Sequence, residues 1–279
     1  MSDALLYVVA TPIGNLGDIP HRAIEVLQSV ALIAAEDTRH SSRLMAHFNI
    51  KTPMISVHDH NERQRVDTII AKLSAGDNIA LISDAGTPLI SDPGFILVRA
   101  VREAGFKVVP IPGCSALITA LSAAGMPSNN FIFEGFLPAK RVGRKQQLQA
   151  IADDTRTVIF YESTHRILES LADMQEVLGA DRYVVIAREL TKTFETIHGA
   201  PLCELIEWIT ADHNQQKGEF VVLVSGAEPI KDQGISKETL RILDLMLEEL
   251  PVKQASTLTA KITGEKKNAL YQEALQRKS

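Results

Sequence analysis

The stretch LISDAGTPLISDPG, residues 81–94, indicates the fold of this chain. It carries two glycines, two prolines and two aspartates, follows an apolar strand pattern at 78–82, and leads into a helical pattern at 95–104. Such a loop lies at the carboxyl end of a strand. In open parallel sheets ligands bind outside those ends, because helices cover both faces of the sheet. The stretch therefore predicts a ligand site on an α/β sheet.

Short apolar runs alternate with helical patterns through the first half of the chain. The runs lie at 5–10, 31–35, 54–57, 78–82 and 107–111. Between them, HRAIEVLQSV and RVDTIIAKL repeat apolar residues at helical spacing. This alternation predicts a mostly parallel sheet with helices on its faces.

The pattern changes after residue 126. FIFEGF, TVIFYES, RYVVIARE and GEFVVLVSG are typical of strands, and 166–178 and 202–209 of helices. Some of these strands are close enough in sequence to pair antiparallel. From residue 236 the pattern is helical only, with interruptions at Pro251 and Gly264. We therefore expect a two-domain α/β protein, with a mostly parallel sheet in 1–126, a mixed sheet in 127–228 and a helical appendage at 229–279.

Composition narrows the class of protein. The chain has 279 residues and a formal net charge of −5, and no apolar run approaches the roughly 20 residues that cross a bilayer. Its beginning does not resemble a secretory signal, so we expect a cytoplasmic protein without a membrane partner. The two cysteines, Cys114 and Cys203, are far apart and form no CxxC pair, which gives no indication of a disulfide framework or a thiolate zinc site.

One basic segment stands out against the negative net charge. Residues 135–152 contain no acid, and they hold four clustered cations, Lys140, Arg141, Arg144 and Lys145. Such a cluster either solubilises the surface or binds phosphates. The basic residues of the C-terminal helices are candidates for the same surface: Lys253, Lys261, Lys266, Lys267, Arg277 and Lys278.

Five loops meet at the predicted carboxyl edge of the first sheet. They read TPIGN (11–15), EDTRH (36–40), HDHN (58–61), SDAGTP (83–88) and PGCS (112–115). None matches GxGxxG, and GxxxxGK[ST] does not occur in the chain, so a pyrophosphate site is not indicated. A ligand cradled by backbone, such as an adenosine-bearing amino acid, fits these loops.

In order along the chain, ATPIGNLGDI, AAEDTRHS, HDHNE, SDAGTPLISDPG, PGCSALITAL, EGFLP, FYESTHRI, ARELTKTFETIHG and GEFVVLV resemble the S-adenosylmethionine (SAM) methyltransferases of the tetrapyrrole methylase superfamily. The resemblance is closest to the branch that methylates small-subunit ribosomal RNA. It implies methylation of the ribose 2′-hydroxyl of a cytidine in the decoding region, and a homodimer. Porphyrin-modifying relatives carry G-D-P where this chain has Gly86-Thr87-Pro88, which argues against a tetrapyrrole substrate.

The same resemblance assigns SAM to a cleft between the two domains, gripped mainly by backbone. The residues that it implies for the cofactor are Pro12, Ile13, Gly14, Asp84, Gly86, Thr87, Ile90, Ser115, Ala116, Glu162, Arg188 and Glu219. The basic segment 140–145 would then bind rRNA, in free form or in the assembled small subunit.

Methyl transfer to a hydroxyl requires a general base or a cation near the reacting oxygen. The candidates at the cleft loops are Asp37, Arg39, His58, Asp59, Asp84, Arg188, Glu189 and Lys192. We predict that Asp37 and Arg39 position the target nucleotide. The alternative is that the two residues form a purely structural ion pair.

Three other functions stay open at this stage. His-Asp-His at 58–60 could belong to a metal phosphoesterase, although no second cluster of ligands accompanies it, and we predict no metal site. A methyltransferase of the same fold could act on a tetrapyrrole or a protein side chain. A noncatalytic rRNA-binding protein could keep the fold without turnover.

Overall fold

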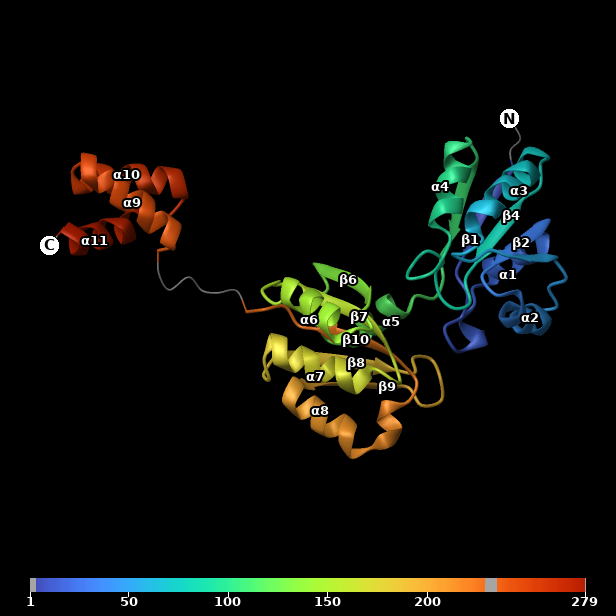
Figure 1. Ribbon diagram of the computed structural model, residues 1–279. Coiled ribbons are helices and arrows are strands. Elements are labelled where there is room, and N and C mark those ends of the chain that lie inside the picture. The colour runs from blue at the N-terminus through green and yellow to red at the C-terminus, as the bar shows by residue number, and fades with distance from the viewer. Residues whose placement is uncertain (1–3, 229–234, 279) are drawn as a thin grey trace. The chain divides into compact units, whose positions relative to one another are not determined.

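The structure is a computed structural model that describes residues 4–228 and 235–278. The chain divides into two compact units, Met1–Ala227 and Glu228–Ser279. The first unit contains two five-stranded sheets, and the second contains three helices (Figure 1). Each unit is described by itself below.

The first sheet is entirely parallel, with the strand order β3-β2-β4-β1-β5. Its strands are β1 (Leu5–Val9), β2 (Leu32–Ala35), β3 (Met54–Ser56), β4 (Ile79–Ile82) and β5 (Lys107–Ile111). Four helices connect them: α1 (His21–Ser29), α2 (Thr38–His47), α3 (Glu62–Ser74) and α4 (Phe95–Glu103). The predicted strands and the parallel sheet are confirmed.

Two apolar cores lie on opposite faces of this sheet. Side chains of α1 and α2 pack with Val9, Ile33 and Ile82 in one core. Side chains of α3 and α4 pack with Leu6 and Leu81 in the other. Successive residues of a strand point to opposite faces, so continuous apolar runs such as 79–82 are buried on both sides. Only the ends of the strands are free to carry a site.

The second sheet is mixed, with the order β6-β7-β10-β8-β9, in which only β6 and β7 are parallel. Its strands are β6 (Phe131–Phe136), β7 (Thr157–Ser163), β8 (Tyr183–Arg188), β9 (Thr196–Pro201) and β10 (Glu219–Val224). Its helices are α5 (Ala116–Ala123), α6 (Arg141–Ala150), α7 (Ile167–Leu178) and α8 (Leu202–Ala211). The predicted mixed sheet is confirmed, but strand β9 was not foreseen.

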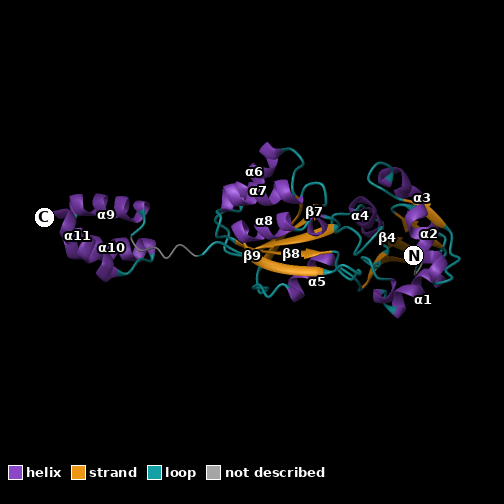
Figure 2. Cartoon of the chain, turned by 90° about the horizontal axis from the view of Figure 1, so that it is seen from below, coloured by secondary structure: helices purple, strands orange, loops and turns teal. Residues whose placement is uncertain are grey.

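Helices cover the second sheet unequally. Figure 2 shows α6, α7 and α8 on one side of β8 and β9, and α5 on the other. The first core includes Leu148, Leu171 and Leu205 from those three helices, whereas Leu117 and Leu121 of α5 form the second with inner residues of β7, β8 and β10. Because α5 follows β5 of the first sheet and packs on the second, it connects the two halves of this unit.

The second unit consists of α9 (Lys237–Glu249), α10 (Val252–Thr263) and α11 (Lys267–Lys278). The breaks lie at Pro251 and Gly264, as predicted, and Gly264 has a φ of 79°, which favours glycine after a helix. A small core of Leu243, Ala255, Leu270 and Ala274 holds the three helices together. Within the described residues, no helix is long and apolar enough to cross a membrane.

Candidate methyl-donor site

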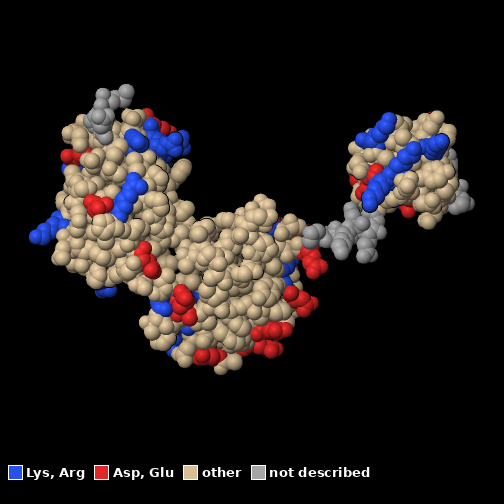
Figure 3. All heavy atoms as spheres, turned by 180° about the vertical axis from the view of Figure 1, so that it is seen from behind, with Lys and Arg blue, Asp and Glu red and all other residues tan. Residues whose placement is uncertain are grey.

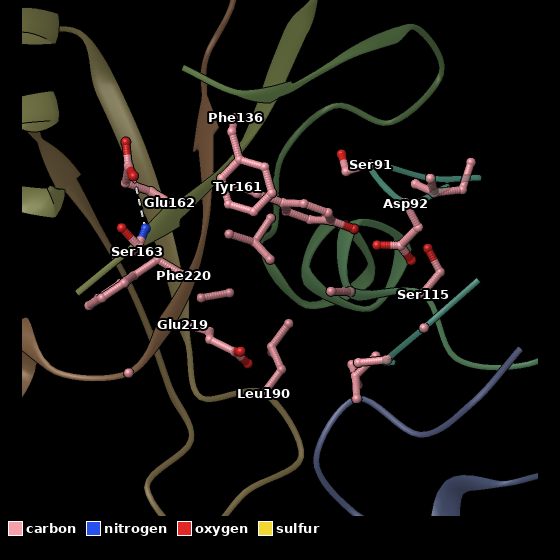
Figure 4. Close-up of a pocket in the computed structure, with 18 of the residues that line it drawn as sticks. Ser91, Asp92, Ser115, Phe136, Tyr161, Glu162, Ser163, Leu190, Glu219 and Phe220 are labelled. Atoms are coloured by element: carbon pink, nitrogen blue, oxygen red, sulfur yellow. Dashed lines mark hydrogen bonds between the residues drawn. The ribbon is translucent and has the colours of Figure 1, made fainter. Parts of the chain in front are cut away.

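A cavity of about 530 Å³ lies in the first unit and draws its walls from both sheets. The first half contributes Ile13, residues 85–87 and 90–92, and the start of α5 at 115–116; the second contributes Phe136, 161–165, Ala187, Leu190, Lys192 and 218–221. Figure 4 shows these side chains converging from the two halves. The volume is within the roughly 300–1,000 Å³ of small-molecule sites.

Hydrogen bonds join three loops of the first half into one wall. Thr11 and Gly86 exchange backbone hydrogen bonds, with the Thr11 N–H donating to the Gly86 carbonyl at 2.8 Å and the Gly86 N–H donating to the Thr11 carbonyl at 3.0 Å. The Thr87 hydroxyl donates to the Cys114 carbonyl at 2.9 Å. The loops after β1, β4 and β5 therefore hold one another, and Gly86 has the φ of 81° that this turn requires.

The opposite wall is largely apolar and aromatic. The rings of Phe136 and Tyr161 meet edge to face with centroids 5.6 Å apart, and the Phe133 ring meets Tyr161 in the same way at 4.8 Å. Leu190 and Val221 extend the same wall. The Leu117 N–H donates to the Tyr161 hydroxyl at 3.3 Å, which fixes that ring against the start of α5. Such a wall suits a flat apolar group such as a purine.

Carboxylates give the cavity a negative side. Asp92 lines it, and Figure 4 shows its carboxylate pointing inward beside Ser115. Burial is the main cause that raises the pKa of Asp92 to about 6; the nearby carboxylates of Glu36, Asp84 and Asp59 add to it, and a hydrogen bond from Ser83 opposes it. Burial likewise raises the pKa of Glu36. A carboxyl group that titrates near pH 6 can take up a proton at neutral pH.

The loop after β8 brings a cation to the cavity. Lys192 donates from Nζ to Glu189 Oε1 at 2.8 Å and to Glu219 Oε2 at 2.9 Å. Arg188 supports this loop, because its buried guanidinium donates hydrogen bonds to the carbonyls of Lys217 at 3.0 Å and Phe194 at 2.9 Å. The hydrogen bonds of Arg188 thus hold in place the segment that carries Lys192.

Comparison with known proteins identifies the family. The model of the tetrapyrrole (corrin/porphyrin) methylases matches residues 5–206, and the model of the RsmI C-terminal HTH domain matches 233–278. This chain belongs to the tetrapyrrole methylase family. Its methyl donor is accordingly S-adenosylmethionine, and the enzyme is a methyltransferase.

Full-length relatives and solved structures agree with this membership. A protein of Pseudomonas aeruginosa named ribosomal RNA small subunit methyltransferase I is 60% identical over 99% of both chains, and one of Escherichia coli O157:H7 with the same name is 58% identical over 99% of this chain and 96% of the relative. The crystal structure of the methyltransferase CobJ superposes with a TM-score of 0.59 at 19% identity, covering 80% of this chain and 95% of that one. The last similarity shows the fold of the methylase unit.

The cavity of this tetrapyrrole methylase fits SAM by the chemistry of its walls. The apolar side at Tyr161 and Leu190 suits the adenine ring. Asp92 and Glu219 offer carboxylates to a ligand that carries a sulfonium and an ammonium charge. The backbone at Gly86 forms part of the lining, and a Cβ there would lie 3.5 Å from the Ile13 side chain.

Most residues that the resemblance assigned to the cofactor meet at this cavity. Eight of them line it: Ile13, Gly86, Thr87, Ile90, Ser115, Ala116, Glu162 and Glu219. Four lie outside its lining: Pro12, Gly14, Asp84 and Arg188. Gly14 is nevertheless close, because a Cβ there would come within 2.6 Å of Lys192 Cγ. The carboxylate of Glu162 is occupied by the Ser170 hydroxyl at 2.6 Å and the Ser163 N–H at 2.8 Å.

Sequence reasoning missed Asp92 and Tyr161. Asp92 stands in the same quoted stretch as the assigned residues, in a second Ser-Asp pair at 91–92 that repeats the pair at 83–84. That repetition is the signal that could have drawn attention to it. Tyr161 lies in a strand pattern that indicates core packing, and the structure places it both against the core beside α5 and on the cavity wall.

Asp37 and Arg39, predicted to position the target, lie outside the cavity lining. They form an ion pair of 2.9 Å, and the hydrogen bonds from Arg39 lower the pKa of Asp37 to about 2. The Arg39 side chain is 91% exposed, so its remaining donors face solvent. Asp37 also accepts from the Arg39 N–H at 2.8 Å, which caps the start of α2. An exposed carboxylate with so low a pKa is a poor base but can still hold a substrate.

The basic segment 140–145 differs most from its prediction. Arg144 is 2% exposed and donates from Nε to Asp173 Oδ2 at 2.6 Å, inside the interface between α6 and α7. Arg141 pairs with Asp173 at 2.8 Å and with Glu176 at 2.9 Å. Because its guanidinium is buried, Arg144 is not available to a phosphate, and its assignment to an RNA surface is corrected: it binds the two helices together.

The His-Asp-His segment has local partners. The His58 ring lies 3.2 Å from the Asn61 side-chain amide, and the His58 and His60 rings are 5.9 Å apart. In residues 4–228 and 235–278, no group of three or more His, Cys, Asp or Glu is arranged to hold a metal ion.

Proposed function

We propose that this methyltransferase transfers the methyl group of SAM to the ribose 2′-hydroxyl of a cytidine in the decoding region of small-subunit (16S) rRNA. The observation that carries this proposal is the full-length similarity to proteins named ribosomal RNA small subunit methyltransferase I, at 60% identity for the P. aeruginosa relative. The cytidine and the 2′-oxygen come from the resemblance of the loop motifs, including Gly86-Thr87-Pro88.

The proposal includes the setting of the reaction. Segments 1–126 and 127–228 act as two domains that share the methyl-donor cavity, and 229–279 is a separate domain. The enzyme works as a homodimer in the cytoplasm on the assembled small subunit. Lys140, Arg141 and Lys145 contact the rRNA backbone; Arg141 keeps a 66% exposed side chain despite its ion pairs.

The chemistry needs little beyond alignment and proton removal. Bound SAM supplies an electrophilic methyl carbon on a sulfonium sulfur. The chain must exclude water, orient the 2′-oxygen in line with that carbon and accept the hydroxyl proton. As the new O–C bond forms and the S–C bond breaks, the proton passes to a base of the protein.

We assign the base to Asp92. It lines the cavity, its carboxylate points inward, and its pKa of about 6 leaves it ionised at pH 7 yet able to take a proton. Asp37, with a pKa of about 2, accepts a proton far less readily. Asp37 and Arg39 instead hold the target nucleotide outside the cavity, which their exposure permits.

The decisive experiment uses methyl-labelled SAM and small subunits from cells that lack this enzyme. After transfer, the rRNA is hydrolysed with alkali, which cannot cleave next to a 2′-O-methyl ribose. We expect the label in an alkali-resistant dinucleotide whose 5′ residue is a cytidine. Label in mononucleotides would mean methylation of a base. Absence of label, with SAM bound normally, would refute an rRNA substrate and direct the search to tetrapyrroles and protein side chains.

A further inference from the structure

The three C-terminal helices carry their charges in separate places. Four acids lie on α9, at Glu238, Asp244, Glu248 and Glu249. Helix α10 has no acid, and the stretch 252–267 holds the four lysines Lys253, Lys261, Lys266 and Lys267 against one acid. Figure 3 shows Lys and Arg running as a stripe across one face of this unit. One side of a small domain is therefore basic although the chain as a whole is acidic.

Ion pairs neutralise the arginines of this unit but not the lysines of 252–267. Arg241 pairs with Glu238 at 2.7 Å, and Arg277 pairs with Asp244 at 2.6 Å and with Glu273 at 2.9 Å. Both arginines of the unit thus face acids. The four lysines named above are exposed, and none forms an ion pair with the side chains described in 235–278. Their charges are available to a partner.

The backbone places these lysines on a helix-turn-helix. Helix α10 ends at Thr263, α11 begins at Lys267, and the turn between them is three residues long with Gly264 at a φ of 79°. A turn of this length with a glycine is typical of the motif, in which the first helix crosses the phosphate backbone of a duplex and the second helix enters its groove. Lys266 is the last residue of the turn, and Lys267 is the first residue of the second helix.

Helix α10 directs its lysines outward. Ala255, Ser256 and Thr259 face the interior of the unit, whereas Lys253 and Lys261 are exposed on the other side. These two lysines are eight residues apart, about 12 Å along the helix. The lysines therefore form an extended row along α10 to the turn, which can contact several phosphates.

We propose that the lysines of α10, of the turn and of the start of α11, at 253, 261, 266 and 267, bind the phosphate backbone of the rRNA substrate. The inference rests on the proposed rRNA methyltransferase function and adds a second contact surface to it. Unpaired, exposed lysines release counterions when they meet phosphates, which produces affinity without sequence specificity. The C-terminal helices then hold the substrate, while the methylase unit selects the nucleotide.

The test compares two double variants of the full-length enzyme that remove the same charge. Lys261→Gln with Lys267→Gln alters the proposed surface, and Lys51→Gln with Lys107→Gln alters two exposed lysines of the methylase unit. Dissociation constants for naked 16S rRNA and for unmethylated small subunits are measured between about 50 and 200 mM salt. We expect the first variant to lower the slope of log K against log salt by about two, about one for each lysine, and the control to keep the wild-type slope.

Kinetics separate binding from chemistry. The first variant should raise KM for small subunits severalfold while kcat and the Kd of SAM stay at the wild-type values. Equal slopes in the two variants would overturn the inference and leave these lysines a solubilising role. Weaker binding to subunits with unchanged binding to naked rRNA would also overturn it, in favour of a ribosomal protein as partner. If wild-type enzyme binds rRNA but transfers no methyl group to it, the proposed function fails, and the salt slopes still decide the role of the lysines.

Discussion

Replacement of Asp92 by asparagine should remove the base and keep the shape of the cavity. General-base catalysis contributes about 10²–10⁴-fold, so we expect kcat to fall by that factor in Asp92→Asn. The Kd of SAM should rise by a much smaller factor, because one of the two carboxylates that face the cationic ligand is lost while the apolar wall at Tyr161 and Leu190 is untouched. The measurement is single-turnover methyl transfer to small subunits beside calorimetric titration with SAM.

The pH profile gives a test that a merely structural role would not pass. With a pKa of about 6 for Asp92, the wild-type kcat/KM should fall about tenfold per pH unit below pH 6 and reach a plateau above it. Glu36→Gln removes a negative charge that helps raise this pKa, so the acid limb should move to lower pH. The reasoning is refuted if Asp92→Asn keeps more than about a tenth of the wild-type kcat, or if Glu36→Gln leaves the acid limb in place.

The Asp92→Asn substitution should also stabilise the fold. Because burial raises the pKa of Asp92 from 3.8 in the unfolded chain to about 6, folding takes up a proton between these values, and stability falls as pH rises through that window. Above pH 6 the full shift would correspond to about 3 kcal/mol. The carboxyl is only partly buried, so screening reduces this to about 1–2 kcal/mol. Urea unfolding at pH 7 should show Asp92→Asn more stable by that amount, and at pH 4 by much less.

Four further substitutions test other parts of the molecule. Gly86→Ala forces a φ of 81° on a residue with a Cβ and should cost about 1–2 kcal/mol in urea unfolding while weakening SAM binding in calorimetry. Arg144→Met removes the 2.6 Å partner of the buried Asp173 carboxylate, which keeps Arg141 at 2.8 Å, so urea unfolding should show a loss of about 1–3 kcal/mol, and the salt slope of rRNA binding should not change. Asp37→Ala and Arg39→Ala should each raise KM for small subunits and leave the Kd of SAM at its wild-type value. If KM and the Kd of SAM rise equally, the two residues do not position the nucleotide and serve only to cap α2.

The fold could be predicted because nearly every strand has a local pattern. The four-residue runs of β2 and β4 are apolar throughout and buried on both faces, which is typical of central strands in a parallel sheet. Strand β9 was missed because its sequence, TIHGAP, contains glycine and proline and lies at the edge of the sheet. Its pairing with β8 depends on the neighbouring strand, which no local pattern reveals.

The site could be predicted only as far as the edge of the sheet. The carboxyl ends of β1, β4 and β5 do carry the cavity, as their loops indicated. The choice among carboxylates depends on the direction of each side chain, however, and Asp37 and Asp92 are equivalent in a sequence. Arg144 shows the same limit, because its partner Asp173 lies 29 positions away on another helix. A run of cations does not reveal which member turns inward.

Backbone strain around the cavity was equally invisible in the sequence. In the described part of the chain, five residues other than glycine have positive φ: Asn49, Leu89, Ser91, Glu189 and Thr191. The last four lie in the two segments that carry Asp92 and Lys192, and Ser91 itself lines the cavity. Each costs on the order of 1–3 kcal/mol and persists only where the surroundings enforce it. Here the mutual hydrogen bonds of the loops and the buried Arg188 provide that enforcement. The strained positions alternate with Ile90, Asp92, Leu190 and Lys192, and Ser91 lines the cavity together with these four. Both segments that bring carboxylate and cation to the cavity are therefore held in conformations that the free chain would rarely adopt.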